Sequence, residues 1–529
     1  MPASHRINFV IKRLLAVYYY LDPKISGPTM NSRRTLFALA FLTAGIFTHC
    51  LGVDTQAQDA VPRFEPSDCA IPIPKDETPV CGYVVVPENR TIRNGRTIRL
   101  PIIIQKSNSP GPKPDPLLRT FGGPGASSLN MMRGRKTSPW LNDRDLIIFE
   151  QRGTKYAQPA LECPEVDGAN ISSAKKHLDA RSARTNELNA AKACYDRLKS
   201  SGIDLSGYNS RESAADIEDV RRVLKYDKIN LYGVSYSSRL MLNVIRDHPN
   251  GIRSVILESP LPPQVNYDEL GVDGIVYSLN KLFSNCRAEA NCKKAYPDLE
   301  KEFYSAVAEL NKRPVTAPGK DNISGETFNV LLNGDDLVTW IIDYFLSNEA
   351  AAIADVPMII HQIFGKDYTI FKRYAGDKVN PSSNSWGMRY SIWCSEEMPF
   401  ENIKKIKEQS TRYSGLQGYE VMALPDICSV WKVPAGEPVE NKPVASGVPA
   451  LVLTAEYDAY TPPAWGKETA SYLKNSFLVE VPWTGHGPGF SVSCVRDLIA
   501  GFLNDPGKAP DASCGEKVKK AFKFTVKSP

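Results

Sequence analysis

The sequence predicts an α/β protein whose open, mostly parallel sheet of eight strands is interrupted by a helical insertion. Short continuous apolar runs alternate with helical stretches before residue 261 and after residue 446, which is typical of parallel strands buried on both faces. Between residues 262 and 445 strand signals become few and helical spacing dominates. This segment is long enough to form a domain of its own. We therefore expect a core built from residues 58–261 and 446–529, with residues 262–445 as a lid.

The eight expected strands are short and rich in β-branched or aliphatic residues. They lie near residues 83–86, 97–105, 116–121, 145–149, 228–233, 254–257, 450–454 and 477–481. Asn94-Gly95 between the first two is a hairpin signal. Helices are expected near residues 174–200, 213–224, 238–247, 299–310, 336–346, 353–364 and 495–503.

The composition is that of an ordinary globular protein, with 42% hydrophobic and 23% charged residues. The 64 Lys and Arg residues exceed the 59 Asp and Glu residues by only five. The chain also lacks a basic stripe with interleaved aromatic residues, so nucleic acid is not expected as a partner.

The N-terminal region is predicted to direct export to the periplasm or the extracellular space. Residues 30–57 combine Arg33-Arg34, an apolar run and a small residue near a cleavage site after Ala57 or Ala60, as in a signal peptide. The run is too short and too interrupted for a stable membrane span. Residues 1–29 precede a credible start at Met30, and we interpret them as an upstream extension from a misplaced start codon.

The eleven cysteines lack C-x-x-C spacing and have no histidines at zinc-finger spacing, so neither a metal site nor a thioredoxin-like site is expected. If Cys50 is removed with the leader, ten cysteines remain. An even number is compatible with up to five disulfides in an oxidising compartment. Scattered buried thiols are the alternative.

The strongest local motif is Gly233-Val234-Ser235-Tyr236-Ser237, which follows an expected strand and precedes an expected helix. It departs from G-x-S-x-G only at its last position. That motif forms a sharp turn that lifts a serine hydroxyl out of a parallel sheet. Ser237 stands where a small residue is needed for the helix to pack on the strand, and serine still fits there.

A serine nucleophile needs a base, usually a histidine oriented by a carboxylate. Of the six histidines, only His486 follows an expected strand, between Gly485 and Gly487. Asp458 follows the expected strand at 450–454, and Glu456 is the alternative carboxylate. The chain order Ser235, Asp458, His486 is that of nucleophile-elbow hydrolases.

Two backbone N–H groups are expected to form an oxyanion hole. Tyr236 immediately follows the nucleophile, and Gly123 lies in Gly122-Gly123-Pro124-Gly125 after the third expected strand. A plain Gly/Pro turn is the alternative interpretation of this loop.

These pieces together resemble the α/β-hydrolase family of proline iminopeptidases and tripeptidyl aminopeptidases. The matching stretches are FGGPGASS, DLIIFEQRGT, LYGVSYSS, AEYDAYTPP and TGHGPG, with cysteines around CGYVVVPEN and SCVRDLIAGFL. The resemblance covers about residues 69–514. It implies an α/β-hydrolase fold, a helical lid, the triad Ser235–Asp458–His486 and no cofactor. It also implies release of N-terminal residues or short peptides from oligopeptides.

The resemblance further implies a disulfide pairing. The pairs would be Cys69–Cys81, Cys163–Cys194, Cys286–Cys292, Cys394–Cys428 and Cys494–Cys514. One departure concerns specificity. Many proline-specific members have His before GGPG, and this chain has Phe121, so a preference for proline is not implied.

An exopeptidase must also recognise a free amine, so an acidic lid residue is expected. Glu396 and Glu397 are the candidates, with a solvated acidic turn as the alternative. The substrate is expected to be a peptide or a small ester. An esterase on the same scaffold and a non-catalytic binding protein remain alternatives, because fold and triad do not fix the substrate.

Overall fold

The computed structural model describes residues 60–75, 77–132, 142–416, 419 and 426–526. The expected signal peptide, the expected upstream extension and Cys50 lie outside the described residues. None of the described helices is both long enough and apolar enough to cross a bilayer.

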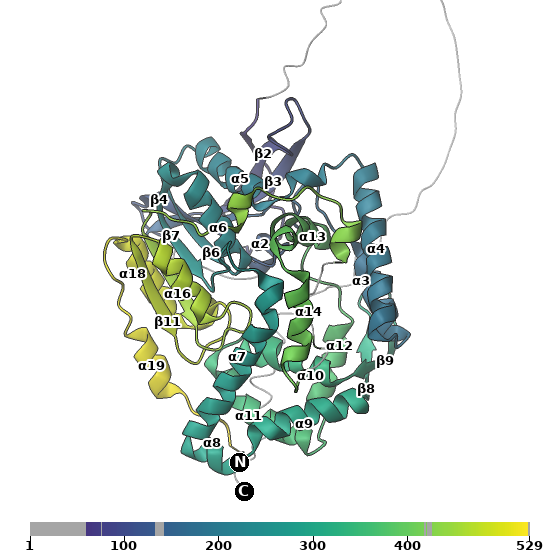
Figure 1. The fold of residues 1–529 in the computed structure, drawn as a ribbon. Helices are drawn as coiled ribbons and strands as arrows, with labels where there is room; N and C mark the ends of the chain where they lie inside the picture. The colour runs from purple at the N-terminus through teal and green to yellow at the C-terminus, as the bar shows by residue number, and fades with distance from the viewer. Residues whose placement is uncertain (1–59, 76, 133–141, 417–418, 420–425, 527–529) are drawn as a thin grey trace, which may run out of the picture. The chain divides into compact units, whose positions relative to one another are not determined.

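The core is an open sheet of nine strands in the order β1-β2-β3-β5-β4-β6-β7-β10-β11 (Figure 1). The strands are β1 Arg63–Pro66, β2 Val80–Pro87, β3 Thr97–Gln105, β4 Lys113–Thr120, β5 Arg144–Phe149, β6 Ile229–Val234, β7 Ile252–Glu258, β10 Ala450–Ala455 and β11 Ser476–Val481. Every pairing from β5 to β11 is parallel, whereas β1, β2, β3 and β5 pair antiparallel. The α/β-hydrolase prediction of a mostly parallel sheet is confirmed.

The prediction of eight strands is wrong by one. The ninth strand is β1, a short edge strand that pairs antiparallel with β2. The sequence there is RFEP, inside a stretch that looks like a Pro-rich loop, and its proline occupies the end of an edge strand where no ladder hydrogen bond is required. The hairpin between β2 and β3 is confirmed, and Asn94 in its turn has φ 55°.

Helices cover both faces of the sheet. The helices outside the region between β7 and β10 are α2 Ser128–Met132, α3 Pro164–Lys175, α4 Ala180–Ser200, α5 Ser210–Val223, α6 Tyr236–Asp247, α16 Pro463–Tyr472, α17 Pro488–Ser491, α18 Ser493–Asn504 and α19 Cys514–Ala521. Of these, α3 and α4 lie beside the β8–β9 hairpin (Figure 1). Successive β6 side chains show the two faces: Leu231 packs in the cluster with α5 and α6, and Tyr232 packs in the cluster with α18. Successive side chains of a strand point to opposite faces of the sheet, so each strand contributes to the helix layers on both faces.

The helix expected over residues 174–200 is two helices. α3 ends at Lys175, the connecting His177 has φ 51°, and α4 begins after Asp179, whose side chain accepts a hydrogen bond from Ser182 N. A left-handed residue cannot continue a helix, and an aspartate N-cap starts the next one.

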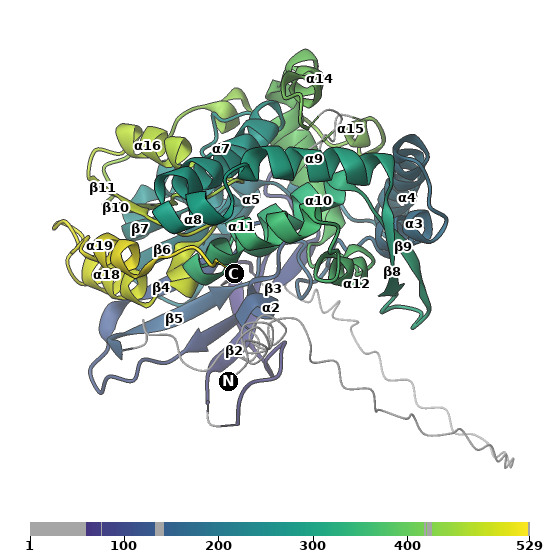
Figure 2. The ribbon, with the colours of Figure 1, turned by 90° about the horizontal axis from the view of Figure 1, so that it is seen from below.

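The region between β7 and β10 is mainly helical, and its described strands are confined to the hairpin β8 Val315–Lys320 and β9 Thr327–Leu332. Its helices are α7 Tyr267–Ala288, α8 Ala290–Ala295, α9 Leu299–Lys312, α10 Gly334–Ile341, α11 Ala350–Phe364, α12 Tyr374–Lys378, α13 Trp386–Ile392, α14 Ile403–Arg412 and α15 Ile427–Val430. Helices α9, α10 and α11 lie together in Figures 1 and 2, away from the β2–β3 hairpin. They share one hydrophobic cluster with α7. The lid boundaries 262 and 445 remain a prediction.

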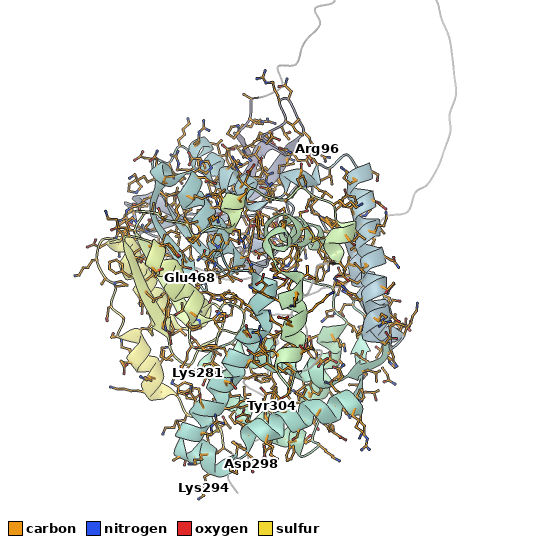
Figure 3. The ribbon with its side chains drawn as sticks, viewed as in Figure 1. Arg96, Lys281, Lys294, Asp298, Tyr304 and Glu468 are labelled. Atoms are coloured by element: carbon orange, nitrogen blue, oxygen red, sulfur yellow. A yellow bond between two sulfur atoms is a disulfide. The ribbon has the colours of Figure 1, made fainter. Side chains whose placement is uncertain are left out.

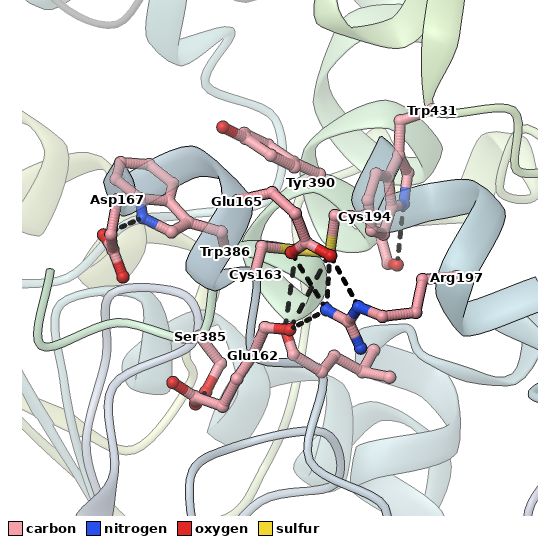
Figure 4. Close-up of a disulfide and its surroundings, with 12 residues drawn as sticks. Glu162, Cys163, Glu165, Asp167, Cys194, Arg197, Ser385, Trp386, Tyr390 and Trp431 are labelled. Carbon is pink, nitrogen blue, oxygen red and sulfur yellow. Dashed lines mark hydrogen bonds and ion pairs between the residues drawn. A yellow bond between two sulfur atoms is a disulfide. The ribbon is translucent and has the colours of Figure 1, made fainter. Parts of the chain in front are cut away.

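All five disulfides implied by the resemblance are present, namely Cys69–Cys81, Cys163–Cys194, Cys286–Cys292, Cys394–Cys428 and Cys494–Cys514. Figure 4 shows that Cys163–Cys194 joins the start of α3 to α4 beside the Arg197–Glu165 ion pair. On the same side, Trp386 of α13 donates its indole N–H to Asp167 at 2.9 Å. The helical region between β7 and β10 is therefore attached to α3 through Trp386.

A buried ion cluster connects the segment after β5 to α5. Asp216 of α5 is fully buried and accepts hydrogen bonds of 2.7 Å from both Arg152 and Arg90. Burial alone would raise the pKa of Asp216, but the two guanidinium groups hold that pKa below its ordinary value. The stabilisation is therefore present at neutral pH and is lost as the pH falls through the lowered pKa.

We expect Asp216→Asn to lower the free energy of unfolding by about 3–5 kcal/mol, because it leaves the buried Arg152 guanidinium with Glu212, 3.5 Å away, as its carboxylate partner. Urea unfolding at pH 7 measures the change. Asp196→Asn is the control, since Asp196 is exposed and pairs with Lys192 on the surface, where a loss under about 1 kcal/mol is expected. Equal shifts in the two variants would contradict the prediction.

Candidate active site

Ser235 lies at the turn between β6 and α6, with φ 61° and ψ −134°. It is the single residue between positions 229 and 245 that is not buried. A non-glycine residue at positive φ is uncommon and here has a structural cause, because the backbone must reverse between strand and helix within one residue. The elbow predicted from the sequence is thus present as geometry, with its serine accessible.

Two glycines allow the elbow to pack. A Cβ on Gly233 would lie 2.4 Å from the carbonyl oxygen of Ser237, so the first glycine of the motif is required where α6 approaches β6. Ser237 is fully buried and accommodated. A Cβ on Gly122 would lie 2.8 Å from the Cβ of Ser235 and 3.0 Å from Tyr236 N. The Gly122–Gly125 loop therefore lies directly against the elbow.

Asp458 and His486 meet beyond the ends of β10 and β11, which are neighbouring strands. His486 Nδ1 lies 2.9 Å from both carboxylate oxygens of Asp458. Asp458 is fully buried, and it also accepts hydrogen bonds from the backbone N–H groups of Tyr460 and Thr461 and from the Thr461 hydroxyl. With Nδ1 directed at Asp458, Nε2 is the imidazole atom free to exchange a proton with a nucleophile.

Asp458 and His486 each shift the pKa of the other. Burial alone would lower the pKa of His486, but the charge of Asp458 and its hydrogen bond raise that pKa above the ordinary 6.5. Burial alone would raise the pKa of Asp458, but the charge and hydrogen bond of His486 keep it below its ordinary value. Asp458 therefore stays ionised at neutral pH, and His486 binds a proton more readily than a free histidine.

The Gly122–Gly125 loop and helix α2, which follows it, are held by hydrogen bonds from two other segments of the chain. Gln151, after β5, donates to the Phe121 carbonyl at 2.5 Å, and Glu150 accepts from Leu129 N at 2.9 Å. From the lid, Arg389 donates to the Gly123 carbonyl at 3.2 Å and Ser385 N donates to the Gly125 carbonyl at 2.9 Å. Gly123 has φ 112°, a conformation that favours glycine.

Comparison with known proteins agrees with this geometry. The sequence pattern described as "alpha/beta hydrolase fold" matches residues 120–320, and the one described as "TAP-like protein" matches residues 416–514. The chain belongs to the α/β-hydrolase family. The first match contains Gly123 and Ser235 of the candidate site, and the second contains Asp458 and His486.

Relatives that span most of this α/β-hydrolase are named as peptidases. It is 23% identical over 452 residues to serine protease Hip1 of Mycobacterium tuberculosis, which covers 80% of this chain and 85% of that one. It is 27% identical over 476 residues to a tripeptidyl aminopeptidase of Streptomyces lividans, with coverages of 82% and 83%. Among solved structures, a proline iminopeptidase from Mycobacterium smegmatis matches with a TM-score of 0.36 at 13% identity, over 80% of this chain and 98% of that one.

Glu456, the alternative carboxylate, points elsewhere in the α/β-hydrolase. It pairs with Lys281 of α7 at 2.9 Å and accepts a hydrogen bond from Trp483 N at 2.8 Å. Lys281 is labelled in Figure 3 on the outer side of α7. Asp458, rather than Glu456, is therefore the carboxylate that contacts His486.

Glu396 and Glu397 are both buried, which corrects the expectation that they meet a substrate amine and also the alternative of a solvated turn. Glu396 is 1% exposed and accepts from the Ser210 hydroxyl at 2.6 Å, and the same hydroxyl lies 2.7 Å from the Tyr236 hydroxyl. Glu397 pairs with Arg239 of α6. Their carboxylates thus attach the lid to the first turns of the elbow helix.

Sequence reasoning missed a different lid carboxylate, Asp343. Tyr460, two residues after Asp458, donates its hydroxyl to Asp343, and its ring lies edge-on to the His486 imidazole with centroids 5.6 Å apart. Asp343 belongs to a single π-helical turn, Ile342–Leu346, and such turns often occur at functional sites. The same lid segment accepts a hydrogen bond from Gly485 N at Asn348 O, 2.7 Å away.

Among the described residues, one group has ligand atoms close enough together for a metal ion: Cys163, Glu165 and Cys194. Its two sulfurs form a disulfide and its carboxylate is paired with Arg197 (Figure 4). Metal ligation by cysteine requires the thiolate. We therefore do not assign a metal site to it.

We expect the rate at which a fluorophosphonate labels Ser235 to fall as the pH decreases, with an apparent pKa above 6.5, because a protonated imidazole cannot accept the serine proton. Asp458→Asn should slow labelling by about 10⁴-fold at pH 7.5. Labelling rates from pH 5 to 9, followed by mass spectrometry, give both values. A rate independent of pH over this range would contradict the assignment of His486 as the base.

Proposed function

We propose that the protein is a serine hydrolase that cleaves acyl bonds through a covalent intermediate on Ser235. The observation that carries this proposal is the buried Asp458–His486 pair, which lies beyond the same edge of the sheet as an accessible serine at a strained elbow. Ligand sites of open α/β sheets lie at the carboxyl ends of their strands.

In the first step, the Ser235 hydroxyl oxygen attacks the substrate carbonyl while His486 Nε2 takes the hydroxyl proton. The backbone N–H groups of Tyr236 and Gly123 stabilise the oxyanion that forms, a contribution of about 10²–10³ in rate for each donor. The intermediate collapses as His486 returns the proton to the leaving amine. Water then attacks the acyl-enzyme with His486 as base, and Asp458 stabilises the imidazolium in both steps.

The substrate class that we propose is the oligopeptide, cleaved near a free N-terminus. The peptidase names of the relatives support this, since they span most of the chain. The five disulfides support export to an oxidising compartment, where peptides from outside the cell would be the substrates. We make no proposal for proline at the cleavage site.

Asp343 is our candidate for the group that binds the substrate ammonium. It is accessible to solvent, it belongs to the predicted lid, and the Tyr460 side chain contacts both Asp343 and the His486 imidazole. The side chain keeps surface in contact with solvent, but the surrounding protein desolvates its carboxylate and raises the pKa of Asp343 to about 6, although the hydrogen bond from Tyr460 acts in the opposite direction. The carboxylate is therefore ionised at pH 7, where a peptide amine is still mostly protonated.

A panel of chromogenic substrates tests the proposal. It contains an aminoacyl arylamide and a tripeptidyl arylamide, each with a free and an acetylated N-terminus, and a simple aryl ester. We expect the arylamides with free amines to have the highest kcat/KM and Ser235→Ala to abolish turnover. If only the ester is hydrolysed, the protein is an esterase. If no substrate is turned over and fluorophosphonate does not label Ser235, it is a binding protein on this fold.

We expect Asp343→Asn to reduce kcat/KM for free-amine substrates by about 10- to 100-fold, the effect of losing a charged hydrogen bond. Hydrolysis of acetylated substrates should change little. In the wild type, the preference for free amines should decline as the pH falls through about 6, because Asp343 becomes protonated. Asp355→Asn is the control, since Asp355 is a lid carboxylate bonded to Thr525. An unchanged preference in Asp343→Asn would exclude this role.

A further inference from the structure

Glu258 and Ser259 form a buried pair at the carboxyl end of β7, the strand between β6, which carries Ser235, and β10, which precedes Asp458. Both residues are 0% exposed. Ser259 N donates to the Leu453 carbonyl of β10 at 2.8 Å, so the pair is anchored to the neighbouring strand. A charged residue and a polar residue without solvent access must find their partners inside the protein.

Besides Leu453, this pair interacts with two residues of the proposed triad, Ser235 and Asp458, and with the loop that carries the third, His486. Ser235 N donates to the Glu258 carbonyl at 3.0 Å. The Ser259 hydroxyl faces Asp458, and this interaction helps to lower the pKa of that carboxylate. Ser259 Oγ also accepts from Gly487 N at 3.0 Å, immediately after His486.

The Glu258 side chain completes the contact with the His486 loop. One carboxylate oxygen accepts from Gly489 N, and the other accepts from the Tyr232 hydroxyl at 2.6 Å. A Cβ on Gly489 would lie 2.4 Å from the Tyr232 hydroxyl and 2.8 Å from Glu258 Oε1, so only glycine fits at that position. The loop that carries His486 is therefore bonded to β7 at two points, on either side of Pro488.

We propose that Glu258 and Ser259 are positioning residues that set the geometry of the nucleophile, the carboxylate and the base at the same time. The inference rests on the proposed function. Neither residue contacts the reacting atoms through its side chain. Ser259 fixes Asp458 and the start of the His486 loop, and Glu258 fixes the end of that loop and, through its backbone, the amide of Ser235.

The backbone of Ser259 offers a clean test of this role. Its φ is 47°, in the left-handed region that glycine adopts without strain. Ser259→Gly therefore removes the hydroxyl and relieves the backbone at the same time. A loss of activity in this variant cannot come from a strained fold. Lys225→Gly is the matched control, because Lys225 has φ 59° at the end of α5 and contacts none of the triad residues.

We expect Ser259→Gly to stay folded at the assay temperature, because relief of the backbone offsets the loss of the hydrogen bond from Gly487 N. Its kcat should fall by about 10- to 100-fold, with a KM close to the wild-type value. Lys225→Gly should retain the wild-type kcat. Both are measured on the best substrate of the panel, at a temperature where circular dichroism shows each protein fully folded. A wild-type kcat in Ser259→Gly would overturn the proposal.

Glu258→Gln gives a second test, which measures the pH dependence of kcat/KM. A purely structural role of Glu258 would leave that pH dependence unchanged. The titratable and charged groups facing Glu258 and His486 are Asp458, Arg119, Tyr232 and Tyr460, with Arg496 facing Tyr232. Burial raises the pKa of Glu258, and the ionised form of Glu258 raises the pKa of His486. In the pH range where Glu258 is ionised, Glu258→Gln should therefore move the acid limb of the kcat/KM profile to lower pH. An acid limb that stays at the wild-type position or moves to higher pH would contradict the role of Glu258.

The failure of this inference and the failure of the proposed function give different results. If the wild type neither hydrolyses a substrate of the panel nor reacts with fluorophosphonate at Ser235, the proposed function fails. If the wild type is active and Ser259→Gly is equally active, only the positioning role fails. If Glu258→Gln does not fold, Ser259→Gly decides the question alone.

Discussion

The hydrogen bond between Asp458 and His486 is the interaction on which the rest of the site depends. A fully buried carboxylate is unstable without partners, and Asp458 is surrounded by donors: His486 Nδ1, two backbone N–H groups, the Thr461 hydroxyl and the Ser259 hydroxyl. Each of these donors comes from a segment just beyond the end of β7, β10 or β11. The requirement to satisfy one buried charge therefore fixes three loops relative to each other.

Much of this could be predicted from the sequence, because the responsible signals are local. A continuous apolar run identifies a buried parallel strand, and the residues that follow it lie at the edge of the sheet where sites are built. Ser235, Asp458 and His486 each follow such a run, so the sequence predicts that they lie at the same edge of the sheet. The structure shows the contact between Asp458 and His486. The disulfide pairs came instead from the family resemblance, since the spacing of ten cysteines leaves many connectivities open.

The errors have a shared physical origin, which is that they concern contacts between distant segments. Glu396 and Glu397 look like a solvated acidic turn, and only the fold reveals that Arg239 and Ser210 face them. Asp343 lies in an apolar helical pattern that gives no sign of its neighbour Tyr460. The strand β1 was missed because its pairing with β2 overrides a Pro-rich sequence that locally favours a loop. Glu258 and Ser259 resemble the ordinary end of a strand until their partners are known.

The helical region between β7 and β10 contacts two loops of the candidate site. A Cβ on Gly485, next to His486, would lie 2.2 Å from the Leu346 carbonyl oxygen, and Ser385 and Arg389 bond the Gly123–Gly125 loop. An exchange of lids between relatives is therefore not a neutral graft. A transplanted lid would need a backbone carbonyl in the place of Asn348 and a side-chain donor in the place of Arg389. Without them, the loop that carries His486 and the Gly123–Gly125 loop of the host core would lose hydrogen bonds that hold their shape. The shapes of the His486 loop and of the Gly123–Gly125 loop therefore depend on the helical region between β7 and β10.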